Sequence, residues 1–567
     1  MINTLNMQTD NNLLTSRRWY ALAAISVAAY VVTACWLTDN TPKFDDLNDV
    51  FGFFKQLALA HTLPQKIGAF FYPNNEHVTA FSHFIYFLQY HLLGEVRFYG
   101  LTLIGHLIII TTGCLLGCAI NSERKPFYCA VFVIGYINLY YWDSSFKAMT
   151  AISNQAVILF SLATLFALVR VKSFALGITF ALLATFTQGN GVLIWPVGAA
   201  ILLLDAQYQP QRLRYIMLWL LTAVGAGLLY AGAKHTYGAP SPISLTYVIE
   251  HWEAKFIGQA TGSIFGFLGS TVFSTAHIEL AVAVGVLVLL AALFWLLRYR
   301  DTDWLISGIL LFVLASALTA AATRGLAFGA AGAMETRYKM YSLLTALLLS
   351  AVCIEYWLPV RWRSRAALLL LAAAISIQLS AFRMVPFIQS QAQRFQASLA
   401  TWLEDGDFRR QAIYFPPMSD HFLFVAEHLG VINLMQFAPE AAILPRLPAV
   451  AGQSCPPTST PAAPCSIAIR HRGNALAVVV SADSTLPALP ATITLCDTQT
   501  DAAMAFAIPK TATALQTWLI PEAEIPAGQY RVLIQPAQQA ACETTLIKKP
   551  RKVVSEMRTL FKEQTQN

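Results

Sequence analysis

The feature that most constrains this chain is a series of apolar blocks, each close to the roughly 20 residues that a helix needs to cross a bilayer. Apolar residues make up 56% of the 567 residues and charged residues only 12%, whereas soluble proteins are about a quarter charged. The blocks are continuous, so we predict a polytopic α-helical membrane protein. About eleven transmembrane helices are expected, at residues 19–38, 97–120, 127–142, 154–170, 174–187, 191–204, 215–233, 278–297, 304–322, 339–358 and 366–382.

Lysine and arginine gather in short clusters between alternate blocks, which predicts that these loops face the cytoplasm. If Val78–Leu93 also crossed the membrane, every later cluster would fall on the opposite side. Because its His83 and Tyr86 suit the headgroup level, we predict that this segment lies in the outer interface. An odd number of spans then places everything after Phe382 outside. The clusters are Arg17–Arg18, Arg124–Lys125, Arg170 with Lys172, Arg212 with Arg214, Arg298 with Arg300, and Arg361 with Arg363 and Arg365.

The composition divides the chain into a cytoplasmic N-terminus (1–18), a membrane domain (19–383, with an outer loop at 39–96) and a soluble part. The first span has no small-residue cleavage site after it, so it is predicted to be a retained anchor. Strand-length apolar runs separated by turns are typical of a small β-sandwich. The soluble part comprises a small α/β segment (384–445), a Pro/Ala/Ser linker (446–465), a β-rich domain (466–547) and a basic tail (548–567).

Cysteines are unevenly distributed. The soluble part holds four, an even number that is compatible with two disulfides in an oxidising compartment, and four free thiols are the alternative. They are Cys455, Cys465, Cys496 and Cys542.

Polar residues concentrate in the predicted outer loops. Asp45 and Asp46 follow the first span, where a carboxylate at the rim of a membrane cavity can act as a general base toward a hydroxyl or amide. The alternative is that one of them caps the segment Leu47–Ala60. Asp143 follows Trp142 at the outer end of a span.

Two arginines, Arg324 and Arg337, bracket a Gly/Ala-rich stretch on the same side. Such a pair suits a phosphate through forked, charge-assisted bonds, and an ion pair with Glu335 is the alternative. The chain lacks the phosphate-loop, dinucleotide, HExxH and CxxC motifs. Its net charge of +7 is explained by the cytoplasmic clusters, so neither a nucleic-acid partner nor a metal site is predicted.

Four short motifs occur in order along the predicted membrane domain. They are Asp45-Asp46, Asn75-Glu76-His77, the tight Gly/Asn-rich turn Gln188-Gly189-Asn190-Gly191 between two short spans and before Trp195-Pro196, and Arg324 before Glu335-Thr336-Arg337-Tyr338. Taken together, these motifs resemble the GT-C superfamily of integral-membrane glycosyltransferases, in a bacterial branch, over about residues 15–385. One position departs from that branch: Val78 stands where an arginine usually follows the Glu-His pair, so Lys66 or His77 would substitute.

The resemblance implies an enzyme of the bacterial inner membrane that moves a hexosyl or pentosyl group from a polyprenyl-phosphate donor to a periplasmic glycan, lipid or protein. Asp46 or Asp45 would be the base, and Asp143 would position the acceptor. No cofactor is implied, and superfamily members differ in their use of a divalent cation. The implied substrate-binding residues are Lys66, Glu76, His77, Gln188, Asn190, Arg324, Arg337 and Tyr338.

An alternative is a flippase or transporter of a lipid-linked envelope precursor. Such proteins carry ionisable groups near the middle of the membrane and internal repeats. Here the predicted spans hold almost no charge: His106 lies mid-span, where we expect a hydrogen bond between helices, and Glu355 lies near a cytoplasmic end. A scaffold that only displays the soluble part would leave the acidic loop and the arginines unexplained.

Overall fold

The computed structural model describes residues 16–74, 77–237, 254–273, 275–325 and 331–405, followed by short stretches between 422 and 548. It divides into two compact units, residues 1–392 and 393–567. The first unit is helical and the second contains two small β-sheets.

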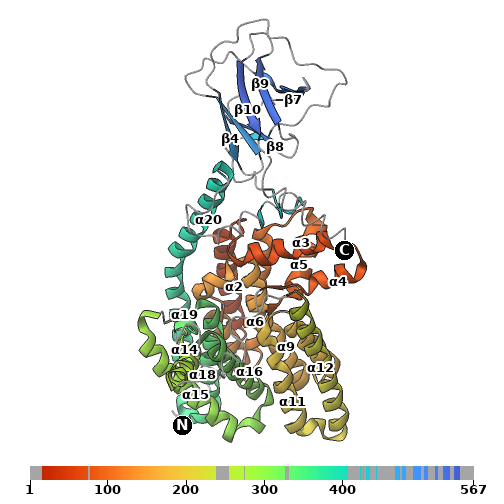
Figure 1. The fold of residues 1–567 in the computed structure, drawn as a ribbon. Helices are drawn as coiled ribbons and strands as arrows, with labels where there is room; N and C mark the ends of the chain where they lie inside the picture. The colour runs from red at the N-terminus through yellow and green to blue at the C-terminus, as the bar shows by residue number, and fades with distance from the viewer. Residues whose placement is uncertain are drawn as a thin grey trace. The chain divides into compact units, whose positions relative to one another are not determined.

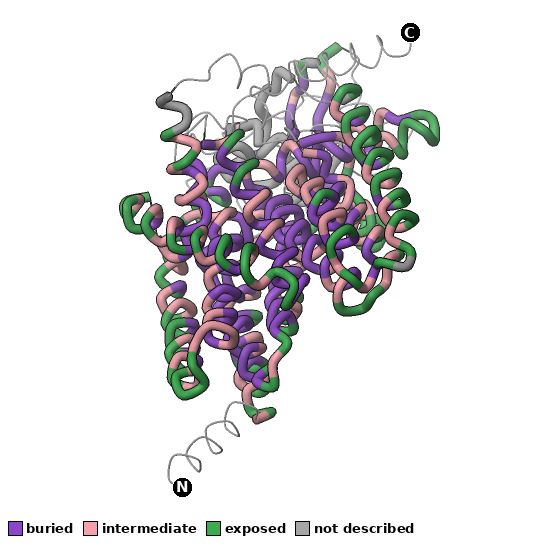
Figure 2. The backbone as a smooth tube through the Cα atoms, turned by 90° about the horizontal axis from the view of Figure 1, so that it is seen from below, coloured by how far each residue is buried: buried purple, intermediate pink, exposed green. Residues whose placement is uncertain are grey.

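Within the described part of the chain, eight helices are long and apolar enough to cross a membrane. Several of them leave leucines exposed on their outer faces, including Leu221, Leu228 and Leu297, and Figure 2 shows buried residues concentrated in the interior of the bundle. Large exposed apolar surfaces of this kind suit contact with lipid, which is consistent with a polytopic membrane protein. The helices that contribute these spans are α2 (Arg18–Leu37), α6 (Phe98–Gly117), α9 (Ala148–Phe166), α12 (Arg212–Tyr237), α15 (Ile278–Arg298), α16 (Trp304–Ala320), α18 (Thr336–Val352) and α19 (Val360–Ala381), the last continuing through η10 (Phe382–Met384) into α20 (Val385–Asp405).

The other three predicted spans correspond to shorter helices, α7 (Lys125–Tyr136), α10 (Phe174–Thr185) and α11 (Ile194–Leu204). The apolar block 127–142 is not one helix. Asn138 ends α7: its Nδ2 donates to the Gly135 carbonyl at 2.8 Å, and its Oδ1 accepts from the Tyr140 amide at 2.8 Å. A one-turn segment η2 (Leu139–Tyr141) and α8 (Trp142–Ser145) follow.

Helices α10 and α11 form a tight hairpin, as the Gly/Asn-rich turn predicted. The turn contains η4 (Gly189–Leu193). A Cβ atom at Gly191 would overlap the Ala184 carbonyl, so only glycine allows this approach. The remaining segments of the first unit are α14 (Ala254–Gly269), η3 (Ala167–Val171), η5 (Ala206–Gln211), η6 (Thr275–His277), η7 (Arg300–Thr302), η8 (Ala321–Gly325) and η9 (Cys353–Trp357).

The predicted outer loop forms a layer of short helices, and α3, α4 and α5 lie across one end of the bundle (Figure 1). Helix α5, with 14 residues, covers most of the segment Val78–Leu93 and is not among the eight candidate spans. Its position in the outer interface stays a prediction. The layer comprises η1 (Leu47–Phe51), α3 (Gly52–Leu59), α4 (Leu63–Phe70), the hairpin of β1 (Pro73–Asn74) with β2 (His77–Val78), and α5 (Ala80–Leu93).

Three of the loops that carry basic clusters meet in one interlinked group, which we call the basic end. Arg170 donates to Asp303 and to the Ala119 carbonyl. Arg124 pairs with Glu355 at 3.3 Å. These contacts join the α6–α7, α9–α10 and α15–α16 loops and η9, so the alternation of basic loops corresponds to a real clustering in space.

Substituting Gly105 with alanine is expected to destabilise the first unit by about 1–3 kcal/mol, the usual cost of overpacking a core. A Cβ atom at Gly105 on α6 would lie 2.8 Å from the Ala151 carbonyl oxygen on α9. Thermal unfolding in detergent measures the effect. Gly227→Ala on α12 is the matched control, because nothing lies within 4 Å of a Cβ there; equal destabilisation by both variants would contradict the predicted helix contact.

The second unit contains two four-stranded sheets, with strand orders β10-β9-β6-β7 and β3-β8-β5-β4. Strands β4 to β10 fall where the strand-length runs of the predicted β-rich domain lie, whereas β3 precedes it. The linker 446–465, the tail beyond residue 548 and the cysteines Cys455 and Cys465 lie outside the described residues, while Cys496 is disulfide-bonded. The strands are β3 (Ala442–Ile443), β4 (Ile467–Arg472), β5 (Ala475–Val480), β6 (Pro490–Asp497), β7 (Ala503–Ala507), β8 (Thr517–Pro521), β9 (Gly528–Pro536) and β10 (Cys542–Lys548).

Candidate functional site

Asp46 caps a helix other than the one we predicted. It occupies the N-cap position of η1 but makes no side-chain bond there. Instead Oδ1 accepts from the Met149 amide at 2.7 Å, and Oδ2 accepts from the amides of Lys43 at 2.8 Å and Ala148 at 3.3 Å. Burial of the carboxyl raises its pKa to about 7, although the hydrogen bonds from the backbone amides act to lower it. Asp46 therefore fastens the first loop to the N-terminus of α9.

Asp45 is half-buried and faces charged side chains from two other segments and from its own turn. Burial raises its pKa, Lys147 and Arg337 lower it, and Asp49 and Asp143 raise it. The preceding residue, Phe44, adopts a left-handed φ of 44°, an unfavourable conformation for a bulky side chain that is found at functional sites. Of the two adjacent acids, Asp45 is the one that points into a charged environment.

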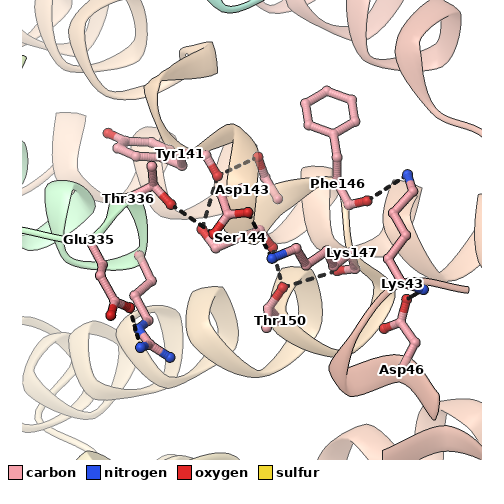
Figure 3. A network of polar contacts seen from close by, with 12 residues as sticks. Lys43, Asp46, Tyr141, Asp143, Ser144, Phe146, Lys147, Thr150, Glu335 and Thr336 are labelled. Atoms are coloured by element: carbon pink, nitrogen blue, oxygen red, sulfur yellow. Dashed lines mark hydrogen bonds and ion pairs between the residues drawn. The ribbon is translucent and has the colours of Figure 1, made fainter. Parts of the chain in front are cut away.

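Asp143 lies at the centre of this environment, on α8 (Figure 3). Its carboxylate accepts from Lys147 Nζ at 2.7 Å and from Thr336 Oγ1 at 3.4 Å. Lys147 also stands 4.5 Å from the centre of the Phe44 ring. It thus connects Asp143 to the turn that carries Asp45. We did not predict a role for Lys147, whose only sequence signal is its four-residue spacing from Asp143.

Arg337 forms an ion pair with Glu335, the alternative that the sequence left open. The pair does not exclude a ligand, because the Arg337 side chain keeps 28% of its surface exposed and still influences Asp45. Its guanidinium lies 5.4 Å from the centre of the Tyr338 ring. Arg324 lies on η8, the segment that follows α16. We refer to Asp45, Asp143, Lys147, Glu335 and Arg337 together as the charged cluster.

Several other predicted binding residues meet near the β1–β2 hairpin. A Cβ atom at Gly189 would lie 2.8 Å from His77 Nδ1 and 3.2 Å from the Tyr230 hydroxyl, so the His77 motif and the Gln188–Gly191 turn are neighbours. Asn190 donates to the Tyr341 hydroxyl at 2.7 Å, which reaches α18 one turn beyond Arg337. Lys66 is exposed on α4, and Glu76 lies outside the described residues.

His83 and Tyr86, whose polar groups suggested the headgroup level, are fully buried within the protein, where they contact Asp49. The sequence shows three polar residues in an apolar setting, but it does not reveal that they are partners.

The two ionisable residues considered for a transporter contact neighbouring helices. His106 Nδ1 lies 2.8 Å from the Tyr30 hydroxyl on α2, which confirms the predicted bond between helices. Glu355 accepts from Tyr128 at 2.7 Å and pairs with Arg124. Both side chains therefore join helices to one another.

Within the described ranges, no three His, Cys, Asp or Glu side chains are grouped so that they could hold a metal ion. No family model matches the sequence, and no curated protein or solved structure matches it either. Any assignment of function therefore depends on the site itself and on the order of the motifs.

Proposed function

We propose that this protein is a membrane glycosyltransferase that moves a sugar from a polyprenyl-phosphate donor to a periplasmic glycan, lipid or protein. The observation that carries the proposal is the charged cluster. Its members come from three segments far apart in the sequence, around residues 45, 143–147 and 335–337. Arg337 is at the start of α18, whereas Glu355 of the basic end follows its other end. A base, an acceptor-positioning acid and cations for a phosphate are thereby available at one place.

In the proposed reaction, Asp45 accepts the proton of the acceptor hydroxyl as its oxygen bonds to the anomeric carbon. The bond between that carbon and the donor phosphate oxygen breaks, and polyprenyl phosphate leaves with the electron pair. Arg337 and Lys147 stabilise the charge that grows on the leaving phosphate, which favours the transition state over the ground state. Asp143 orients the acceptor.

Asp45 is preferred to Asp46 as the base on geometric grounds. A general base must present a free lone pair to the proton that it removes. Both Asp46 oxygens already accept backbone amides, and the side chain is buried. Asp46 then serves to hold the turn on which Asp45 is presented.

The remaining predicted residues divide by chemistry. His77, Gln188 and Asn190 are suited to the hydroxyls of the sugar, with Glu76 beside them in sequence, while Arg324, Lys66 and Tyr338 are suited to the donor phosphate or its lipid. The basic end lies in the cytoplasm, as the distribution of arginine and lysine predicts. This orientation places the charged cluster and the C-terminal unit in the periplasm of a bacterial inner membrane.

The direct test uses the full-length protein in vesicles that contain a radiolabelled short-chain polyprenyl-phosphate hexose, mixed with membranes that contain the acceptor. Transfer of label into water-soluble or lipid-extracted product, with release of polyprenyl phosphate, is the expected result. Movement of intact donor between leaflets without bond cleavage would instead identify a flippase. Repeating the assay with a pentose donor distinguishes the two sugar classes.

A further inference from the structure

Asp49 is a completely buried carboxylate that the proposed reaction does not use. It lies on the π-helical turn η1, four residues after Asp45. Oδ2 accepts from the Tyr86 hydroxyl at 2.8 Å, and Oδ1 accepts from the Thr79 hydroxyl at 2.8 Å and lies 3.2 Å from His83 Nε2. A buried charge is costly unless it is paired and hydrogen-bonded, and these three contacts provide Asp49 with partners on both oxygens.

The surroundings of His83 fix the orientation of its ring. Nδ1 is 2.8 Å from the Phe70 carbonyl oxygen, which only accepts, so Nδ1 carries a proton. Nε2 lies 3.2 Å from both Asp49 Oδ1 and the Thr79 hydroxyl. The ring therefore connects Asp49 to the backbone at the end of α4.

The pair joins three parts of the loop layer. Asp49 belongs to η1, His83 to α5, and the Phe70 carbonyl to the end of α4. Phe53 stacks on the His83 ring at 4.7 Å between centres, with the planes only 8° apart. The turn that carries Asp45 is thus tied to two helices by a buried, hydrogen-bonded link.

We infer that Asp49 and His83 are positioning residues for Asp45, which hold its turn in place and set the pH range in which it accepts a proton. The inference depends on the proposed function only for its kinetic readout. The groups that face Asp45 are Lys147 from the start of α9, Arg337 from α18, Asp143 from α8 and Asp49 from its own turn. Of these, Asp49 is the one that is completely buried.

Asp49→Asn removes a carboxylate that raises the pKa of Asp45, so the pKa of Asp45 should fall and the acid limb of the kcat–pH profile should move down by roughly half a pH unit. His83→Gln keeps that carboxylate but loses the ring that ties the turn to α4 and α5, so kcat should fall while the acid limb does not follow that of Asp49→Asn. The double variant lacks the same carboxylate, so its acid limb should coincide with that of Asp49→Asn.

The experiment compares these three variants with His91→Gln, the same substitution at an exposed position on α5. Titration of the Asp45 carboxyl by infrared difference spectroscopy against Asp45→Asn provides a second readout that needs no transfer activity. If transfer is absent but the carboxyl shifts as expected, the proposed function fails and the inference stands. The inference would be overturned by no shift of the Asp45 carboxyl in Asp49→Asn, or by a kcat in His83→Gln equal to that of His91→Gln. If His83→Gln does not fold, the Asp49→Asn comparison alone decides.

Discussion

Asp45→Asn is expected to reduce sugar transfer by roughly 10²–10⁴-fold, the range that a general base contributes. Asparagine has nearly the same shape but cannot take a proton from the acceptor. Because Asp45 is half-buried and lies among both acids and cations, its charge is not required by any single buried partner. The unfolding temperature should therefore change little, and initial rates measured at saturating donor should show the loss in kcat.

Asp46→Asn is the matched control, since the same substitution one residue later should have the opposite outcome. The asparagine NH2 group would face one of the backbone amides that Asp46 now accepts, so an amide on α9 or at Lys43 loses its acceptor. Leaving a buried donor unsatisfied costs about 1–3 kcal/mol, so the unfolding temperature should fall while folded protein retains activity. A stable Asp46→Asn protein without transfer, beside an active Asp45→Asn protein, would reverse the assignment of the base.

The membrane helices could be predicted because hydropathy is a property of whole segments. Eight long apolar helices and the α10–α11 hairpin occur where the blocks and the Gly/Asn turn predicted them. The break in the block 127–142 could not be predicted, because it depends on one side chain. Asn138 forms hydrogen bonds with backbone groups on both sides of itself. Asparagine in an apolar block does not indicate which partners it will find.

The sequence predicted that the site residues share one side of the membrane, but it did not predict which of them are in contact. Alternation of basic loops placed Asp45, Asp143 and Arg337 on one side, and the structure brings these three segments together. Adjacent acids such as Asp45 and Asp46 look alike in sequence and differ only in what each one meets. The same holds for Asp49 and His83, whose separation of 34 residues gives no sign of contact.

Arg337→Ala is the second large effect that we expect, with kcat/KM for the polyprenyl-phosphate donor reduced by roughly 10²–10³-fold. Removing one preorganised group that stabilises developing charge has this magnitude in other enzymes. The Arg337 guanidinium is held in place by the Glu335 carboxylate and the Tyr338 ring, so it needs little reorganisation when phosphate charge appears. Arg337→Lys keeps the charge but loses the forked donor geometry, so its activity should lie between those of Arg337→Ala and the natural protein.

Glu335→Gln separates this role from a purely structural ion pair. If the pair only stabilises the start of α18, then Arg337→Ala and Glu335→Gln remove the same interaction and should lower the unfolding temperature equally, without a specific kinetic effect. If Arg337 binds the donor phosphate, Glu335→Gln leaves the guanidinium in place, and kcat/KM should stay within about threefold, because a partly exposed ion pair contributes roughly 1 kcal/mol or less. Donor kinetics and thermal unfolding should be measured on the natural protein, Arg337→Ala and Glu335→Gln. Only a phosphate-binding arginine reduces transfer without a matching loss of stability.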